Sequence, residues 1–363
     1  MVSGGALTPM GTVRGIAAGI TSSLLAITAF GGCVTGPRFA DKPVRNIADQ
    51  RLTVRTAAGS GVAVLYVSRD WTVRQPEIAR AIVLLHGTLG RDVFVRMASE
   101  LAASRESGRD TILIAPQFVT LLDVSSHRLP DEILRWRLGS LGSGADAIGP
   151  AAINPFEVVD AIIGRLADRT IFPALGRVVI AGHSGGGQMA QRYAVVGHGD
   201  AVLAKAGIRA RYVVANPSSY LYFSDERPTP DGRLAPFASS DCPSFNRWRY
   251  GLRRAPPYVG KATASDLERA YVKRDVVYLL GTGDIDPHHF ELDTSCAGEA
   301  QGPHRHARGV AYVRYLRGRH PDGLTHRMWE VPAVGHDGDR MLLSTCGLAA
   351  LYGGTDLPDR CDR

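Results

Sequence analysis

VVIAGHSGGG, residues 178–187, runs from β-branched apolar residues straight into a serine flanked by glycines. The pattern G-x-S-x-G in this setting is typical of a sharp elbow between a strand and a helix. The turn strains the serine backbone, and glycines let the strand, the serine and the helix approach one another closely. Such an elbow holds the hydroxyl of Ser184 clear of the sheet, beside the backbone N–H of Gly185. We therefore predict that Ser184 is a nucleophile.

The five-residue pattern also occurs by chance in Gly-Ser loops, so it needs support from the rest of the chain. A strand-like run precedes it, and GGQMAQRYAVV (residues 186–196) continues in a helical pattern. Nucleophilic serines of this type also require an acid and then a histidine, each on a loop after a later strand. The chain contains both residue types in that order.

The acid is expected in the loop GTGDID, residues 281–286, which follows the apolar run 275–280. We prefer Asp284 to Asp286, because an acid in the pattern G-x-x-D directly after a strand is placed to orient a histidine from behind. Either aspartate is also compatible with a turn residue or a helix N-cap, since Pro287 follows. Asp286 is therefore the alternative acid.

The general base is expected at His336, which follows a strand-like run and a glycine and precedes a predicted final helix over residues 339–350. A base in this position accepts the proton of the serine. His183 is only the variable position of the elbow, and His86 precedes the glycine of a different loop. Five other histidines lie among charged residues, as surface histidines do: His288, His289, His304, His306 and His320.

An oxyanion hole is expected next to the serine. The apolar strand 81–85 runs into HGTLG, residues 86–90, where sites of this kind take one of their two backbone donors. The N–H of Thr88 is the preferred donor and that of Leu89 the alternative. The second donor is the N–H of Gly185. A glycine-rich turn without chemistry is the competing interpretation, but four separate pieces occur in the order that one mechanism needs.

Six stretches carry a wider resemblance: IAPQF (114–118), FEVVD (156–160), GHSGGGQ (182–188), ANPSSY (215–220), NRWRYGL (246–252) and the segment 278–309. Through them the chain resembles the α/β-hydrolases, and in particular a bacterial and fungal branch of secreted serine hydrolases. The resemblance covers about residues 50–350. It implies a catalytic triad of Ser184, Asp284 and His336, the same positions that the local patterns indicate.

The order of elements predicts an α/β fold with a mostly parallel sheet covered by helices on both faces. Apolar strand-like runs alternate with amphipathic helical patterns after an opening hairpin in residues 51–68. We expect one α/β-hydrolase domain over residues 51–363, and 45% apolar residues suffice for its core. Residues 117–153 and 217–274 interrupt the alternation, and we interpret 217–274 as a lid over the acyl pocket. The aromatics of this insertion are expected either to line that pocket or to form a small core of their own: Tyr220, Tyr222, Phe223, Trp248 and Tyr250.

The N-terminal residues 1–32 resemble an export signal, with an apolar stretch that is short for a membrane span. Small residues before Cys33 suggest a bacterial lipoprotein signal, with Cys33 as the acylated first residue and 33–50 as a tether. An ordinary cleaved signal and an N-terminal anchor helix are the alternatives. The prediction is a periplasmic or cell-surface protein, anchored to the membrane through a lipid.

The chain has five cysteines, and an odd number in an exported protein requires an explanation. Acylation of Cys33 leaves four, an even set suited to an oxidising compartment. Three pairings are possible. We favour Cys346–Cys361, which would pin the C-terminal tail, with Cys242–Cys296 bracing the loop that carries the acid.

The expected activity is hydrolysis of a small carboxylic ester through an acyl-enzyme intermediate. A serine peptidase or amidase of the same fold is one alternative, and a non-catalytic surface lipoprotein is another. The formal charge of +7 is spread over scattered arginines without a basic run, so we expect no nucleic-acid partner. We also expect no metal and no cofactor, because no C-x-x-C pair or tight Cys/His cluster occurs.

Overall fold

The computed structural model describes Met1 and residues 42–88, 93–104, 108–354, 357–358 and 360–361. The predicted signal apart from Met1, the lipidation site Cys33 and the alternative oxyanion donor Leu89 lie outside these residues. In the part of the chain that is described, no helix combines the length and the apolar character that a membrane crossing needs.

Eight strands form one sheet in the order β1-β2-β4-β3-β5-β6-β9-β10. β1 and β2 form the antiparallel hairpin, β2 pairs antiparallel with β4, and all other pairs are parallel. The strands are β1 (Gln50–Thr56), β2 (Gly59–Val67), β3 (Arg80–Leu85), β4 (Thr111–Gln117), β5 (Arg177–His183), β6 (Arg209–Ala215), β9 (Asp275–Gly281) and β10 (Arg327–Val331).

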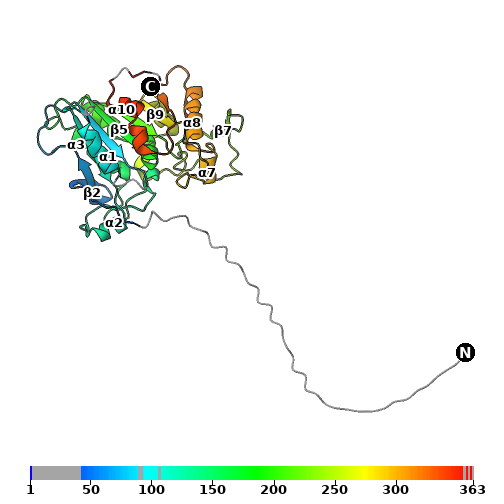
Figure 1. The fold of residues 1–363 in the computed structure, drawn as a ribbon, viewed down its shortest axis with the longest axis horizontal. Helices are drawn as coiled ribbons and strands as arrows, with labels where there is room; N and C mark the ends of the chain where they lie inside the picture. Colours follow the sequence, from blue (N-terminus) through cyan, green and yellow to red (C-terminus); the bar gives the residue numbers. More distant parts are fainter. Residues whose placement is uncertain (2–41, 89–92, 105–107, 355–356, 359, 362–363) are drawn as a thin grey trace, which may run out of the picture. The chain divides into compact units, whose positions relative to one another are not determined.

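Helices cover both faces of this sheet (Figure 1). Successive strand residues point to opposite faces, so Val83 packs into one hydrophobic core and Leu84 into the other. The first core takes side chains from α3 (Pro155–Leu166), α4 (Gly185–Val196) and α8 (Arg305–Arg319). The second takes them from α1 (Val93–Ala103), α9 (Gly338–Leu342) and α10 (Thr345–Tyr352). The predicted α/β architecture is confirmed.

The C-terminal helix differs from the prediction of one helix over residues 339–350. It is divided into α9 and α10, because Ser344 caps α10 by accepting a hydrogen bond from the N–H of Gly347 at 2.9 Å. A serine oxygen that satisfies the first turn of a new helix favours such a break.

The sequence patterns do not predict the shorter helices, because each has too few residues for a recognisable apolar stripe. They are α2 (Leu121–Ser126), α5 (Gly199–Lys205), α6 (Ala264–Tyr271) and α7 (Cys296–Glu299).

The insertion 217–274 contains the small hairpin of β7 (Glu226–Pro228) and β8 (Leu234–Pro236), the single turn η3 (Pro257–Val259) and helix α6. Tyr250 packs with Cys242 and Phe245 in a small separate core, as one of the two expectations has it, whereas two other tyrosines match neither expected role. Tyr220 and Tyr222 are fully buried and pack on Tyr312 of α8, with ring centroids 4.6 and 5.1 Å away. They belong to the main core of the domain, so they fasten the insertion to α8.

Two disulfides join distant segments. Cys242 of the insertion is bonded to Cys296 at the start of α7, with Cα atoms 5.8 Å apart. Cys346 of α10 is bonded to Cys361, with Cα atoms 5.6 Å apart. The structure therefore contains the pairing that we favoured from the sequence.

Candidate active site

Ser184 lies in the turn between the end of β5 and the start of α4. Its backbone has φ +58° and ψ −122°, a region that residues with a Cβ atom rarely adopt. Strain of this kind costs about 1–3 kcal/mol and persists only where the surroundings enforce it. Here the N–H of Ser184 donates to the carbonyl of Ala215 at 3.0 Å, and a Cβ atom on Gly186 would overlap the carbonyl of Leu85. The packing of α4 against β3 and β6 thus holds the strained turn.

His336, on the loop between β10 and α9, connects Ser184 with Asp284. Its Nε2 lies 2.8 Å from the Oγ of Ser184, and its Nδ1 lies 2.8 Å from Oδ2 of Asp284. The side chains of His336 and Asp284 are only 5% and 2% exposed. In the tautomer with a proton on Nδ1, the imidazole donates to the carboxylate and accepts from the serine hydroxyl.

Asp284 follows β9 and is further held by the buried Arg305 of α8, whose Nη1 lies 3.4 Å from Oδ1. Burial alone would raise the pKa of Asp284, but the hydrogen bond from His336 and the charge of Arg305 outweigh it and hold the pKa below its usual value. Asp286, the alternative acid, is exposed and accepts a hydrogen bond from the N–H of His288. The structure therefore brings Asp284 to the histidine and places Asp286 in a turn.

The two expected oxyanion donors lie on one side of the serine. A Cβ atom built on Gly185 would lie 3.2 Å from the backbone N of Thr88, so the two N–H groups belong to neighbouring parts of one wall. Gly87 packs against the Cβ atom of Ser184, which keeps the loop after β3 next to the elbow. This arrangement suits two donors directed at one oxygen atom.

Two further histidines contact His336. The ring of His183 lies 4.6 Å away, and that of His289 lies 4.9 Å away. Burial and the positive charge of Arg305 hold the pKa of His183 well below its usual value, so this ring is neutral beside His336. The charged neighbourhood of His289 in the sequence predicts a surface position, and this prediction is wrong: the side chain is partly buried against His336. No sequence signal indicates this contact, because it depends on how the loop after β9 folds back.

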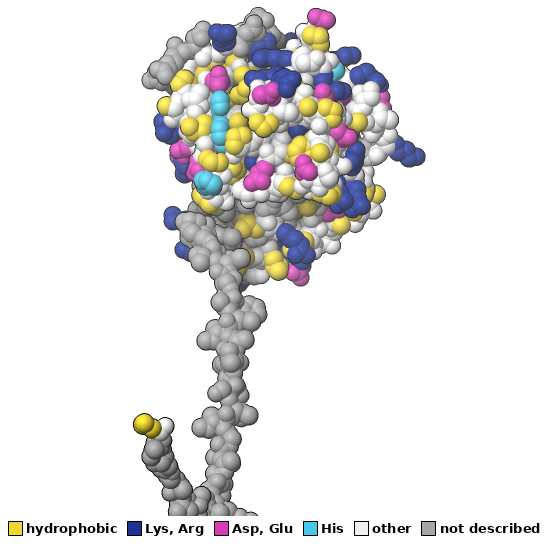
Figure 2. Space-filling view, turned by 90° about the vertical axis from the view of Figure 1, so that its right-hand side faces the viewer, with side chains coloured by type: hydrophobic (Ala, Val, Ile, Leu, Met, Phe, Trp, Pro, Cys, Tyr) yellow, Lys and Arg dark blue, Asp and Glu magenta, His cyan; other side chains and the backbone are white. Residues whose placement is uncertain are grey.

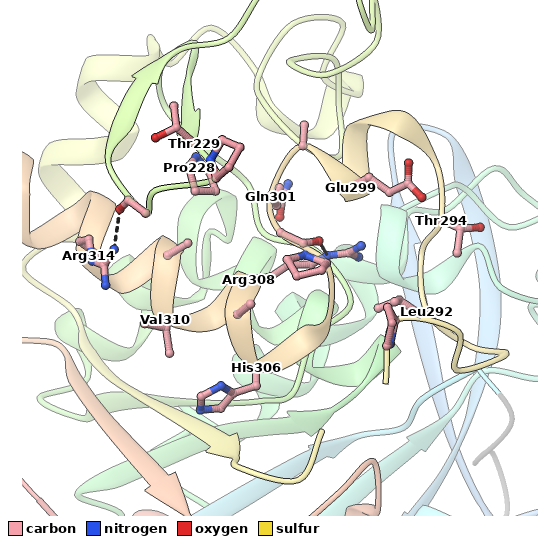
Figure 3. A pocket seen from close by; sticks show the side chains of 18 of the residues that line it. Pro228, Thr229, Leu292, Thr294, Glu299, Gln301, His306, Arg308, Val310 and Arg314 are labelled. Carbon is pink, nitrogen blue, oxygen red and sulfur yellow. Dashed lines mark hydrogen bonds between the residues drawn. The ribbon is translucent and has the colours of Figure 1, made fainter. Parts of the chain in front are cut away.

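A cavity of about 300 Å³ opens beside Ser184. Thr88 and Gly185 contribute to its wall together with mostly polar residues from the insertion and from the segment before α7. A larger groove of about 910 Å³ lies between the β7–β8 hairpin and α8 (Figure 3). Leu292 and Thr294 line both spaces.

The side of the protein that bears β7 and α8 is shown in Figure 2, where basic and acidic side chains are interspersed.

Among the described residues, no group of three or more His, Cys, Asp or Glu side chains is placed to hold a metal ion.

The model of the "Alpha/beta hydrolase family" matches residues 82–345, which contain the strands from β4 onwards, the elbow and His336. The chain belongs to this family. Among solved structures, poly(aspartic acid) hydrolase-1 from Sphingomonas sp. KT-1 is similar with a TM-score of 0.55 and 20% identity, over 86% of this chain and 99% of that one. LpqC, a poly(3-hydroxybutyrate) depolymerase from Bordetella parapertussis, has the same TM-score and identity over 86% of this chain and 93% of its own.

At this level of identity, these likenesses show that the α/β-hydrolase fold is shared. No curated protein sequence matches the chain. Membership of the alpha/beta hydrolase family supports a hydrolase, and the chemistry must be argued from the site itself.

The strain at Ser184 gives a stability prediction. The free energy of unfolding of Ser184→Gly should be about 1 kcal/mol higher than that of Ser184→Ala, so the glycine variant is the more stable of the two. The reason is that glycine adopts φ +58° without a Cβ clash. Urea denaturation of both variants, which equally lack the hydroxyl, measures the difference. Ala161→Gly in α3 is the control, where the ordinary helical backbone predicts the opposite sign. An elbow without strain would give the same sign at both positions.

The neutral His183 gives a pH prediction. Its pKa is lowered in the folded protein, so below about pH 6.5 the unfolded chain binds a proton that the folded chain does not. The free energy of unfolding should therefore decrease as the pH is lowered below about 6.5. This group contributes at most about 1.4 kcal/mol per pH unit to the decrease. His183→Gln removes this contribution, and its curve between pH 6.5 and 4.5 should be flatter than that of the unaltered protein. Parallel curves would contradict the assignment.

Proposed function

We propose that the protein is an exported serine hydrolase that cleaves small carboxylic esters through Ser184, His336 and Asp284. The observation that carries this proposal is the unbroken pair of 2.8 Å hydrogen bonds from Ser184 through His336 to Asp284. The strained serine supports it, because backbone strain of this kind gathers at functional sites.

The reaction begins when Ser184 Oγ attacks the ester carbonyl carbon while its proton passes to Nε2 of His336. The carbonyl oxygen becomes an oxyanion, which accepts hydrogen bonds from the N–H groups of Gly185 and Thr88. Asp284 stabilises the imidazolium, which then donates its proton to the departing alkoxide. An acyl group remains on Ser184.

Water completes the cycle. His336 accepts a proton from a water molecule as its oxygen attacks the acyl carbon, and the second oxyanion uses the same two donors. Collapse of this intermediate releases the carboxylic acid and returns the proton to Ser184. Arg305 stays bonded to Asp284 throughout and keeps this carboxylate oriented, so we assign it a positioning role.

The proposed triad predicts losses of kcat that differ in size from one variant to another. Ser184→Ala should lower kcat for a short p-nitrophenyl ester by roughly 10⁴–10⁶-fold, and Asp284→Asn by about 10⁴-fold through the wrong histidine tautomer. Asp286→Asn is the matched control, and its kcat should be unchanged because Asp286 only stabilises a turn. Equal losses at both aspartates, or full activity of Ser184→Ala, would refute the triad.

Substrate and probe panels separate the alternatives. A peptidase or amidase would turn over aminoacyl anilides in addition to matched p-nitrophenyl esters, because it protonates the amine leaving group. A non-catalytic surface protein would fail to react with a fluorophosphonate probe that labels activated serines. We expect labelling at Ser184 and turnover of the esters without turnover of the anilides.

We further propose that the protein is exported and tethered to a membrane through a lipid on Cys33. The two disulfides support an oxidising compartment, and they pair four of the five cysteines with one another. Mass spectrometry of the mature protein from the native host should find an N-terminal diacylglyceryl-cysteine at position 33. A mature chain that begins elsewhere without lipid would overturn the tether and leave export standing.

A further inference from the structure

The cavity beside Ser184 is rich in hydrogen-bond donors, and Arg249 supplies several of them. Its Nη2 donates to Oδ2 of Asp293 at 2.9 Å and to the hydroxyl of Tyr250 at 3.1 Å. Its Nε and Nη1 have no acceptor among the described residues, and the side chain is 28% exposed in the cavity wall. A guanidinium with one edge anchored and another edge open is well suited to bind a carboxylate.

Gln188 presents a second donor to the same space. Its Oε1 accepts hydrogen bonds from Nη1 of Arg192 at 3.1 Å and from Oγ of Ser219 at 3.0 Å, and both of these residues are fully buried. The carbonyl end of the amide therefore faces the interior, which leaves Nε2 as the end that faces the cavity.

Arg192 places a charge directly behind this wall. It is fully buried, and the acceptors of its hydrogen bonds are neutral oxygens of Gly142, Gln188, Ser219 and Arg249. Burial and the charge of Arg249 lower the pKa of Arg192 to about 9, so it stays protonated at neutral pH. A buried cation without a carboxylate partner is costly, and an anion in the adjacent cavity offsets that cost.

Two acidic residues also line the cavity, and one of them is already engaged. The carboxylate of Asp293 accepts hydrogen bonds from Arg249, Tyr250 and Ser295. The side chain of Glu291 makes no hydrogen bond or ion pair within the described residues, and its charge helps to keep Arg305 protonated. The open donors of Arg249 and Gln188 remain for a ligand.

We infer that this cavity is a subsite for a carboxylate that the substrate carries a few bonds from the ester group. The inference rests on the proposed function and names its substrate class, half-esters of short diacids or esters of short hydroxy acids. The carboxylate would accept from Arg249 and from Nε2 of Gln188, while the ester carbonyl faces Gly185 and Thr88. A volume of about 300 Å³ is at the small end for ligand pockets and favours short substrates.

The kinetic test compares charged and neutral esters of equal length by the release of acid. One arm compares monoethyl succinate with ethyl butyrate, for a carboxylate on the acyl side. The other compares O-acetylglycolate with ethyl acetate, for a carboxylate on the alcohol side. The unaltered protein should prefer the charged ester in at least one arm.

Arg249→Gln should lower this preference about tenfold or more, mainly through KM, as expected for the loss of a charged hydrogen bond. Arg249→Lys, which keeps the charge, should restore part of it and guards against misfolding of the first variant. Arg253→Gln is the matched control, because Arg253 is an exposed arginine of the same insertion that pairs with Asp225. Its preference should equal that of the unaltered protein.

A binding test separates the subsite from the reaction. Calorimetry with the Ser184→Ala variant should detect binding of monoethyl succinate or O-acetylglycolate. In the double variant that also carries Arg249→Gln, the affinity for that ester should be about tenfold weaker or more. If no ester is hydrolysed but this binding is found, the proposed function fails and the subsite stands. Equal rates for charged and neutral esters in both arms, with no effect of Arg249→Gln on the ratio, would overturn the subsite.

Discussion

The close approach of β5 and α4 to the neighbouring strands is the constraint on which the site depends. A Cβ atom on Gly182 would overlap the carbonyl of Gly186, and one on Gly187 would overlap the carbonyl of Ala215. Because no side chain separates these backbones, the first turn of α4 is pressed onto the carboxyl ends of the parallel strands. The hydroxyl of Ser184 can then meet loops that leave β3, β9 and β10 at the same edge.

Much of this site follows from local patterns. Ser184, Asp284 and His336 each follow an apolar strand within a few residues, and parallel strands bring their carboxyl ends to one edge. The order of the strands in the sheet then decides which loops meet. The two covered faces also follow from the apolar runs, since strands buried on both sides lack the alternation of a surface strand.

The parts that the sequence did not predict depend on long-range packing. His289 reaches His336 only because its loop turns back after Asp284, and no periodic pattern marks that turn. Arg249 reaches the cavity because the insertion is packed through Tyr220 and Tyr222 on α8, whereas aromatics in an insertion are compatible with several cores. The break between α9 and α10 had a visible signal, Ser344, but it was outweighed by the apolar residues on either side.

The bond between Cys242 and Cys296 has a consequence for where the protein can work. Cys296 directly follows the segment that carries Asp293 and Ser295, and Ser295 also caps α7. Before oxidation this wall is attached to the insertion only by reversible contacts, so its geometry would fluctuate. If the protein is exported as we propose, a freshly synthesised chain in a thiol-rich cytoplasm would thus hold Ser184 in place while the proposed carboxylate subsite is still unformed. On this proposal, selectivity would mature only after the chain has left the cell interior.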